Sequence, residues 1–488
     1  MRCSWAGPLV AGLVVLAATG CRDERIVFRD RELFTPPQAA ANGFLGYSDT
    51  ARSLPVCGNC HVGPNSEWKE TAHADAWNTL ATNPGRQTFC EGCHTVNALG
   101  NPATGDAGYL AVADARYHDV QCESCHGPGL AHVENPDGEP KPLAPLRVDT
   151  ALTVGCGECH TGVHHPFVEE WRRSAHGATP RASPAGNPSC QGCHTAEDAL
   201  RTWGINVDYI EKDSVNQAGA HLPITCGVCH DPHSAANEGQ LRFAVDIPSE
   251  EDNLCMKCHH KRGTPDPTTF RGPHSPEGPV LLGYGGWWPP NMQLPGGDTI
   301  FATHGSERNP QLCAGCHLVR FAVNDPQSGN FQFQATGHLF LATPCLNAQG
   351  IPQPGDCPDN ERTYRTCTGA GCHGAENVAR SLQANAELRI ELLAETVDGL
   401  LRQIHSNWAT CRTNNSCGAG SPFNSADGTF STAEGAAFNM ELALYPGSVI
   451  HNPFLVEALL TASISQLRKD YNVTVPSGVD LRNILSGQ

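Results

Sequence analysis

The stretch from Cys57 to His259 carries the pattern Cys-x-x-Cys-His seven times, as in Cys122-Glu-Ser-Cys-His126. An eighth copy begins at Cys313, and a ninth variant, beginning at Cys367, has four residues between its cysteines. With 24 cysteines and 23 histidines in 488 residues, chance placement would produce far less than one copy. The nine motifs are therefore not accidental, and Cys-x-x-Cys-His is the attachment signal of c-type haem.

Haem attachment needs this spacing. Two thiols bond to the two vinyl groups of one porphyrin, and the histidine beside them binds the iron from one side as the proximal ligand. Zinc sites and redox dithiols also pair cysteines, but neither needs a histidine directly after the second cysteine. The predicted haem-attachment cysteines are Cys57, Cys60, Cys90, Cys93, Cys122, Cys125, Cys156, Cys159, Cys190, Cys193, Cys226, Cys229, Cys255, Cys258, Cys313, Cys316, Cys367 and Cys372. The predicted proximal iron ligands are His61, His94, His126, His160, His194, His230, His259, His317 and His373.

The ninth motif has its own alternatives because its cysteines are further apart. Gly369 and Gly371 allow the extra residues to loop out, since glycine tolerates tight backbone conformations. We therefore expect a ninth covalent haem here. A disulfide between Cys367 and Cys372, or two free thiols, is the competing interpretation.

The composition argues against large sheets or a thick helical core. Only 39% of the residues are hydrophobic and 7% aromatic, and the chain contains 50 glycines and 37 prolines. Nine porphyrins would supply the missing apolar volume. We therefore predict a mainly α and coil, haem-packed fold with little β-structure and a C-terminal helical segment. The net charge of −18 argues against a nucleic-acid partner, because such proteins need basic patches.

Residues 1–20 have the pattern of an export signal, with an apolar run too short for a permanent membrane span. The ending Ala18-Thr-Gly-Cys21 resembles a bacterial lipobox, in which Cys21 would carry a lipid, and plain cleavage is the alternative. Because Arg22 follows rather than Asp, we expect an outer-membrane lipoprotein facing the periplasm or the cell surface. The charged and Pro-rich residues 21–50 predict a tether.

Four cysteines remain when the haem motifs, Cys3 in the signal and Cys21 are set aside. They are Cys345, Cys357, Cys411 and Cys417. An even remainder in an exported protein suggests two disulfides, and local spacing favours a bond within each neighbouring couple. Sequence alone leaves the other pairings open.

Residues 57–150 and 156–250 are two copies of a unit with three motifs. The flanking sequences recur with the motifs: Trp68-Lys-Glu-Thr-Ala-His73 matches Trp171-Arg-Arg-Ser-Ala-His176. A divergent haem region, residues 251–374, completes a haem domain that we place at 51–374, and its motifs are spaced poorly for a third copy. Residues 375–488 form a haem-free tail.

Each iron has a second axial position to fill. After signal removal the chain holds three methionines against fourteen histidines outside the motifs, so the distal ligand must usually be histidine, and low-potential haems follow. The best candidates are the histidines retained in both copies. These are His73 and His176, His118 and His221, and His132 and His233. His274, His304, His338 and His451 come next, followed by His164, His165, His260 and His405.

The tail predicts about three helices. The first has a stripe formed by Leu382, Leu388, Leu392, Leu393, Val397, Leu400, Leu401 and Ile404. Ser431-Thr-Ala-Glu434 is a capping box that would start the second, and Pro453 suits the first turn of the third. We expect a packing lid in which His451 reaches a haem.

Two segments carry a family resemblance. Cys122-Glu-Ser-Cys-His-Gly-Pro-Gly, followed by His132, and Cys226-Gly-Val-Cys-His-Asp-Pro-His233 resemble the multihaem cytochromes c of the cytochrome c554, pentahaem nitrite reductase and octahaem oxidoreductase superfamily. The likeness covers residues 57–260 well, and the His451-Asn-Pro segment resembles C-terminal segments of that superfamily. It implies covalent haem c and redox chemistry, without selecting one reaction.

Two function classes follow. In the first, the protein carries electrons, in anaerobic respiration, from periplasmic or outer-membrane donors to a terminal or extracellular acceptor. In the second, it is a reductase or oxidoreductase with one five-coordinate iron that acts on nitrite, hydroxylamine or a sulfur oxyanion. The resemblance implies a proximal lysine in nitrite and tetrathionate reductases, and no Cys-x-x-Cys-Lys occurs here. This favours a carrier with redox partner proteins and no catalytic residue.

The second class stays open because hydroxylamine-type enzymes keep a proximal histidine. A third hypothesis is a homo-oligomer or extracellular cytochrome filament, in which a histidine of one subunit would bind a haem of the next.

Overall fold

The computed structural model describes residues 41–138, 141–148, 155–205, 208–211, 221–267, 271–290, 292, 299–369, 371–424 and 427–477. These residues all belong to one compact unit, Pro37–Gln488. The predicted signal, the lipobox Cys21 and most of the tether lie outside the described residues. None of the described helices combines the length and the hydropathy needed to cross a bilayer.

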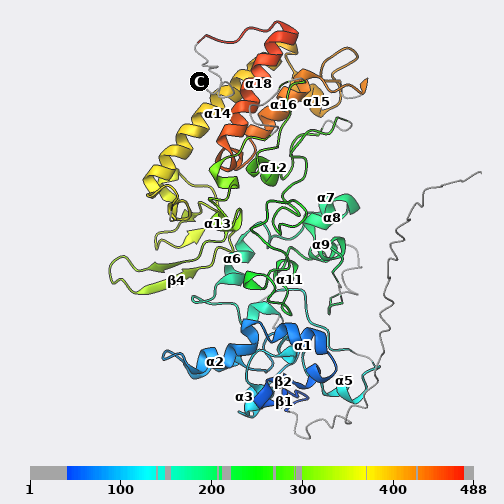
Figure 1. The fold of residues 1–488 in the computed structure, drawn as a ribbon, viewed down its shortest axis with the longest axis vertical. Helices are drawn as coiled ribbons and strands as arrows, with labels where there is room; N and C mark the ends of the chain where they lie inside the picture. Colours follow the sequence, from blue (N-terminus) through cyan, green and yellow to red (C-terminus); the bar gives the residue numbers. More distant parts are fainter. Residues whose placement is uncertain are drawn as a thin grey trace, which may run out of the picture. The chain divides into compact units, whose positions relative to one another are not determined.

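Short helices joined by long irregular segments make up the chain before residue 375 (Figure 1). The α-helices described in this part are α1 (Val62–Trp68), α2 (Ala76–Ala81), α3 (Gly108–Ala111), α4 (Cys122–His126), α5 (Leu130–Glu134), α6 (Phe167–Arg173), α7 (Ala182–Ala185), α8 (Pro188–His194), α9 (Ala196–Thr202), α11 (Cys226–Cys229), α12 (Glu277–Leu281) and α13 (Ala314–His317). Several of them are the motifs themselves, because each motif closes one helical turn.

The β-structure is limited to three antiparallel pairs of strands in the described residues. They are β1 (Tyr47–Asp49) with β2 (Leu54–Pro55), β3 (Phe321–Asn324) with β4 (Phe331–Ala335), and β5 (Cys345–Leu346) with β6 (Pro352–Gln353). In the hairpin of β3 and β4, Phe321 pairs with Ala335. The predicted mainly α and coil fold with little β-structure is confirmed.

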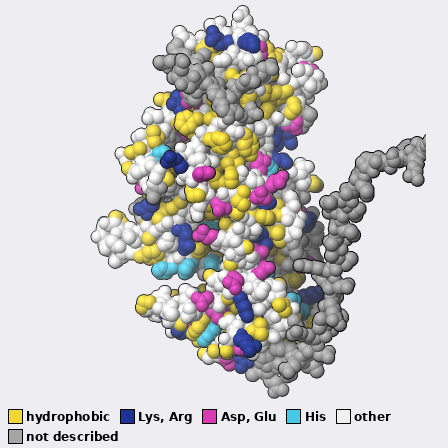
Figure 2. Space-filling model, viewed as in Figure 1, with side chains coloured by type: hydrophobic (Ala, Val, Ile, Leu, Met, Phe, Trp, Pro, Cys, Tyr) yellow, Lys and Arg dark blue, Asp and Glu magenta, His cyan; other side chains and the backbone are white. Residues whose placement is uncertain are grey.

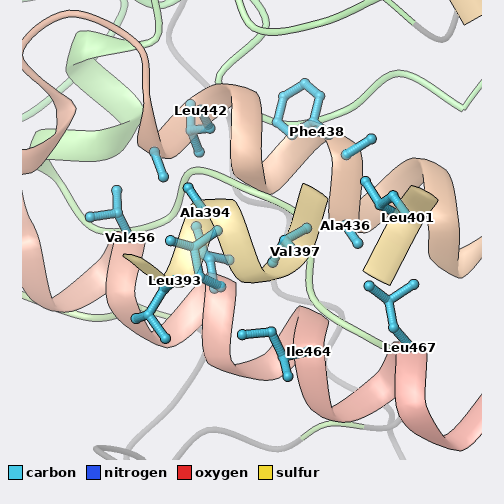
Figure 3. Packing of buried hydrophobic residues seen from close by; sticks show 14 of the residues in the cluster. Leu393, Ala394, Val397, Leu401, Ala436, Phe438, Leu442, Val456, Ile464 and Leu467 are labelled. Atoms are coloured by element: carbon cyan, nitrogen blue, oxygen red, sulfur yellow. The ribbon is translucent and has the colours of Figure 1, made fainter. Parts of the chain in front are cut away.

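Within the described residues, the largest apolar core lies in the tail. Its helices are α14 (Glu376–Ile404), α15 (Trp408–Thr413), α16 (Thr432–Ala443), α17 (Ser448–His451) and α18 (Pro453–Tyr471). Figure 3 shows how side chains of α14, α16 and α18 meet, among them Val397, Phe438 and Ile464, which are almost wholly buried. This end of the chain is therefore held by ordinary hydrophobic packing.

The apolar stripe predicted for α14 is only partly right. Leu393, Val397, Leu400 and Leu401 are buried, whereas Leu382, Leu388 and Leu392 are 50%, 69% and 49% exposed. The neighbours α16 and α18 cover one face of α14, and the helical period turns Leu388 and Leu392 away from that face.

The structure confirms the helix starts predicted for the tail. The Ser431 hydroxyl accepts the N–H of Glu434 at 3.1 Å, and the Ser431 N–H donates to the Glu434 carboxylate at 2.8 Å, which completes the capping box. Pro453 is the first residue of α18, and Asn452 caps that helix by accepting the N–H of Leu455. The structure also contains the disulfides Cys345–Cys357 and Cys411–Cys417, as local spacing favoured.

One prediction concerns a close approach to α16. A Cβ atom on Gly435 would lie 2.1 Å from the ring of Trp287, so Gly435→Ala overpacks this contact and should destabilise the protein by about 1–3 kcal/mol. Gly399 in α14 has open space around it, so Gly399→Ala should leave stability equal or raise it by about 0.5–1 kcal/mol. Denaturation midpoints followed by circular dichroism measure both, and equal midpoints for the two variants would contradict this packing.

Candidate haem-binding sites

Eight of the nine motif histidines face a second imidazole. The pairs, with the distances between ring centroids, are His61 and His132 (6.2 Å), His160 and His73 (6.2 Å), His126 and His233 (6.2 Å), His259 and His176 (6.1 Å), His194 and His274 (6.1 Å), His230 and His338 (6.4 Å), His373 and His304 (6.0 Å), and His317 and His451 (6.2 Å).

This separation matches that of two imidazoles on one metal ion. With a metal–nitrogen bond of about 2 Å on each side and each ring centroid about 1 Å behind its nitrogen, the centroids lie about 6 Å apart. Rings in direct contact would be much closer, as Trp77 and His118 are at 3.7 Å. The eight pairs therefore fit the axial ligands of one iron each.

The space between these residues is large. A continuous cavity of about 3720 Å³ is lined by motif cysteines and by histidines of both kinds, proximal and distal. Pockets for a single ligand usually measure about 300–1,000 Å³. The cavity can therefore take several large flat groups, which agrees with a fold packed around porphyrins.

Hydrogen bonds hold several motif rings in the orientation that a ligand needs. The Nδ1 atom of His94 lies 2.6 Å from the carbonyl oxygen of Ala76, and the Nδ1 atoms of His126, His230 and His317 make equivalent contacts at 2.7–2.8 Å. An Nδ1–H that donates to a carbonyl leaves the Nε2 lone pair free for a metal. Each of these four rings is thus prepared as a ligand through Nε2.

Burial keeps other rings neutral. It lowers the pKa values of His160, His176, His338 and His451 to about 4. For His259 burial is the largest single effect and acts to lower the pKa, but the hydrogen bond to Glu277 and the negative charges of Glu277 and nearby thiolates together outweigh it, so the pKa is raised. A neutral imidazole can donate its lone pair to iron, whereas a protonated ring cannot.

The ninth motif keeps the geometry of the others despite its longer spacing. In the regular motifs the N–H of the histidine donates to the carbonyl of the first cysteine, as from His61 to Cys57 at 2.9 Å. In the ninth, the N–H of His373 donates to the carbonyl of Cys367 at 3.1 Å. Both cysteines are free thiols, and His304 faces His373. The arrangement fits a haem better than a disulfide.

The repeated histidines do not all lie opposite a motif histidine. His118 stacks on Trp77, and the Nδ1 atom of His221 lies 2.6 Å from a Glu197 carboxylate oxygen. In both copies this histidine lies on a segment that runs beside the residues following the preceding motif. His118 forms a β-bridge with Thr95, and the carbonyl of Leu222, next to His221, accepts the N–H of Ala196. Recurrence at this place therefore reflects a common backbone position rather than a facing pair.

His132 and His233 also recur, but they face different motifs. His132 lies opposite the first motif, and His233 lies opposite the third. Of the histidines ranked lowest, the His164 ring stacks on Phe331, and His405 lies beside the sulfur of Cys411. No signal in the sequence distinguishes these roles, since they depend on which loops meet.

Sulfur contacts show which motifs are neighbours. Thiols of different motifs lie close to one another in five pairs: Cys57 and Cys122, Cys93 and Cys159, Cys156 and Cys226, Cys193 and Cys258, and Cys255 and Cys313. Three further pairs are near enough to interact electrostatically: Cys125 and Cys156, Cys229 and Cys258, and Cys316 and Cys367. Together they join all nine motifs.

The resulting order is a line with two side branches. The line runs through the first, third, fourth, sixth, seventh, eighth and ninth motifs. The second motif joins it only at the fourth, through Cys93 and Cys159, and the fifth joins only at the seventh, through Cys193 and Cys258. The second and fifth motifs are therefore ends of side branches in the described residues.

The repeat is visible in these contacts. The indole N–H of Trp68 donates to the carbonyl of Val120, and that of Trp171 donates to the carbonyl of Ile224, just before the third motif of each unit. His73 and His176 then face the first motif of the following unit. His259 of the seventh motif thus takes the place that His160 takes in the fourth motif, opposite the histidine that follows the tryptophan of the preceding unit.

Comparisons with known proteins agree with this geometry. Residues 56–127 match the family model described as cytochrome c554 and c-prime, and residues 221–264 match the doubled CXXCH motif. The chain is a multihaem cytochrome c. This cytochrome binds haem c covalently and belongs to the proteins that use haem iron for electron transfer.

A solved structure supports the fold. The structure of this cytochrome is similar to that of the outer cell wall cytochrome OcwA, with a TM-score of 0.50, 17% sequence identity, and coverage of 87% of this chain and 100% of that chain. At this identity the likeness concerns the fold alone. A search of curated proteins gave no match.

The pairing can be tested on two histidines that recur in both copies. His73→Ala removes the ring facing His160, so it should add one high-spin haem to the electron paramagnetic resonance (EPR) spectrum of the oxidised protein. His118→Ala is the matched control and should add none, because His118 packs on Trp77. The opposite result would show that the facing pairs are not iron ligands.

Proposed function

We propose that this cytochrome carries electrons along nine haem c groups, from a donor in the periplasm or outer membrane to a terminal or extracellular acceptor. The observation that carries the proposal is that neighbouring cysteines connect the first motif to the ninth without a break. The rate of electron tunnelling between two haems falls steeply as the distance between them grows. Porphyrins attached to neighbouring cysteines of this kind would be close enough to pass electrons in turn.

The axial ligands favour low potentials. Histidine rings face eight of the motif histidines, whereas Met256 is wholly buried in an apolar cluster with Leu281, Leu282 and Leu312. Since methionine as an axial ligand raises the potential of a haem, paired histidines suit electron transfer at low potential. This is the range expected for anaerobic respiratory chains.

Export and anchoring are part of the proposal. Attachment of haem outside the cytoplasm, the signal-like residues 1–20 and the lipobox Cys21 support an outer-membrane lipoprotein on a tether. OcwA, the similar solved structure, is named an outer cell wall cytochrome. Partners would be redox proteins or an extracellular acceptor that meet an end of the haem line.

The haem line predicts unequal effects of removing single haems. Cys255→Ala with Cys258→Ala interrupts the line at the seventh motif, so electron equilibration among the haems after flash reduction should slow by at least tenfold. Cys190→Ala with Cys193→Ala removes a side branch and should leave this rate within about twofold of wild type. Intact mass should show nine haems in the wild-type protein and eight in each variant. Equal rates in the two variants would contradict the line.

Anchoring is tested separately. Replacing Cys21 by Ser removes the lipid-bearing sulfur, so the cytochrome should move from the membrane fraction to the soluble fraction while keeping its haems. Retention of the Cys21→Ser variant in the membrane fraction would argue against a lipid anchor.

A further inference from the structure

Three basic side chains lie at the fifth motif, where one side branch ends. Lys261 and Arg262 follow shortly after the seventh motif, which is the neighbour of the fifth. Arg271 lies three residues before His274, the ring that faces the histidine of the fifth motif. All three basic side chains line the cavity. Lys261 is close enough to Cys193 to interact electrostatically, and the two arginines are close enough to His274.

These positive charges are not cancelled by ion pairs. None of the three side chains pairs with a carboxylate among the described residues, although the chain has a net charge of −18. The Arg262 Nε–H donates to the carbonyl of Gly272 at 2.9 Å, which fixes that guanidinium beside the cavity. Glu441, which lies beside Gly272, is held by two hydrogen bonds from Arg412. On the face of the molecule in Figure 2, by contrast, Lys and Arg side chains are interspersed with Asp and Glu.

The corresponding branch end in the first copy lacks this excess of positive charge. Cys93 of the second motif takes the place of Cys193, and it lies near Glu158. On the same side of the cavity Arg320 lies near His165, so one charge of each sign is present. The positive surroundings are therefore a property of the fifth motif and do not come with the shared motif sequence.

The seventh motif, to which the fifth is joined, has a negative charge on its histidine. The Nδ1 atom of His259 lies 3.3 Å from a carboxylate oxygen of Glu277. In the sixth and eighth motifs the Nδ1 atoms of His230 and His317 lie near backbone carbonyl oxygens instead. A carboxylate on the Nδ1–H makes imidazole a more strongly donating ligand, which favours oxidised iron. Glu277 also lies near His274, where it offsets one of the two guanidinium charges.

Charges near a haem decide which oxidation state is favoured. Reduction adds one electron, so nearby cations stabilise the reduced state and raise the reduction potential, most strongly where water is excluded. We propose that Lys261, Arg262 and Arg271 give the haem at the fifth motif a higher reduction potential than the haem at the seventh, so that the fifth motif is where this cytochrome holds an electron.

This inference rests on the proposed electron-transfer function and adds a storage place to it. One electron leaves the reduced haem at the seventh motif and reduces the oxidised haem at the fifth, and no bond or proton changes. Because the fifth motif ends a side branch, an electron held there leaves the haem line open to further electrons.

The test is a redox titration of the full haem-loaded protein, followed by visible absorbance. The component with the highest potential should disappear in Cys190→Ala with Cys193→Ala, and intact mass should show eight haems. The matched Cys90→Ala with Cys93→Ala should also leave eight haems but keep that component. If the highest-potential component survives the loss of Cys190 and Cys193, the proposal is wrong.

Charge variants connect the effect to the basic side chains. Arg271→Gln removes one cation, so the ratio of reduced to oxidised fifth haem at a fixed potential should fall about tenfold, which equals about 59 mV for a one-electron couple. Arg271→Lys keeps the charge and should behave as the wild type. Arg308→Gln is the control, because Arg308 lines the cavity on the segment of His304, which faces the ninth motif. Equal effects of Arg271→Gln and Arg308→Gln would overturn the proposal.

Glu277→Gln tests the other side of the step. The amide oxygen can still accept the Nδ1–H of His259 while the negative charge is lost, so the potential of the seventh haem should rise and the difference from the fifth should shrink. An unchanged difference would contradict the proposal. Equilibration rates along the haem line test the proposed function, whereas these titrations test where electrons rest. Fast equilibration without a high-potential fifth haem would therefore refute the storage place alone.

Discussion

The structure depends on one constraint, the geometry of two imidazoles that face each other across the width of a metal ion. Each pair joins parts of the chain that are distant in sequence, such as His230 with His338 and His317 with His451. A bond through iron would close these long loops, much as a disulfide does, and so reduce the entropy of the unfolded chain. This explains how a chain with so many glycines and so few aromatic residues keeps a defined fold before residue 375.

The tail is held together differently from the haem region. It has three long helices with a buried apolar core, and it contributes one ring, His451, to the haem region. Gly447 makes the approach possible: it has a left-handed φ of 84°, and a Cβ there would lie 3.1 Å from the His451 ring. The segment around Trp287 is fixed to α16 by two hydrogen bonds with Asn439. Hydrophobic packing thus positions the last axial ligand.

The repeated unit links these features to function. In each unit the helix that carries Trp68 or Trp171 presents its following histidine to the next unit, so neighbouring units share an iron site. Under the proposed function, electrons would pass between units at the same contacts that hold the units together. The side branches vary more, since in the described residues the middle motif has a facing histidine in the second unit and none in the first.

The sequence alone predicts the features that depend on residues close together in the chain. The motifs, their proximal histidines, the capping box at Ser431 and the two disulfides depend on spacings of a few residues, and the structure agrees with the predicted caps and disulfides. Recurrence of His73 and His176 also led to rings that face motif histidines. These features need no knowledge of distant parts of the chain.

Which histidine faces which motif was decided only by tertiary structure. His118 and His221 recur as faithfully as His73 and His176, yet their rings contact Trp77 and Glu197. His274, His304 and His338 each face a motif histidine without being repeated. The order of the haem line and the bare side of the second motif are of the same kind. They depend on contacts between loops that are tens of residues apart in the chain, and such contacts leave no pattern in the local sequence.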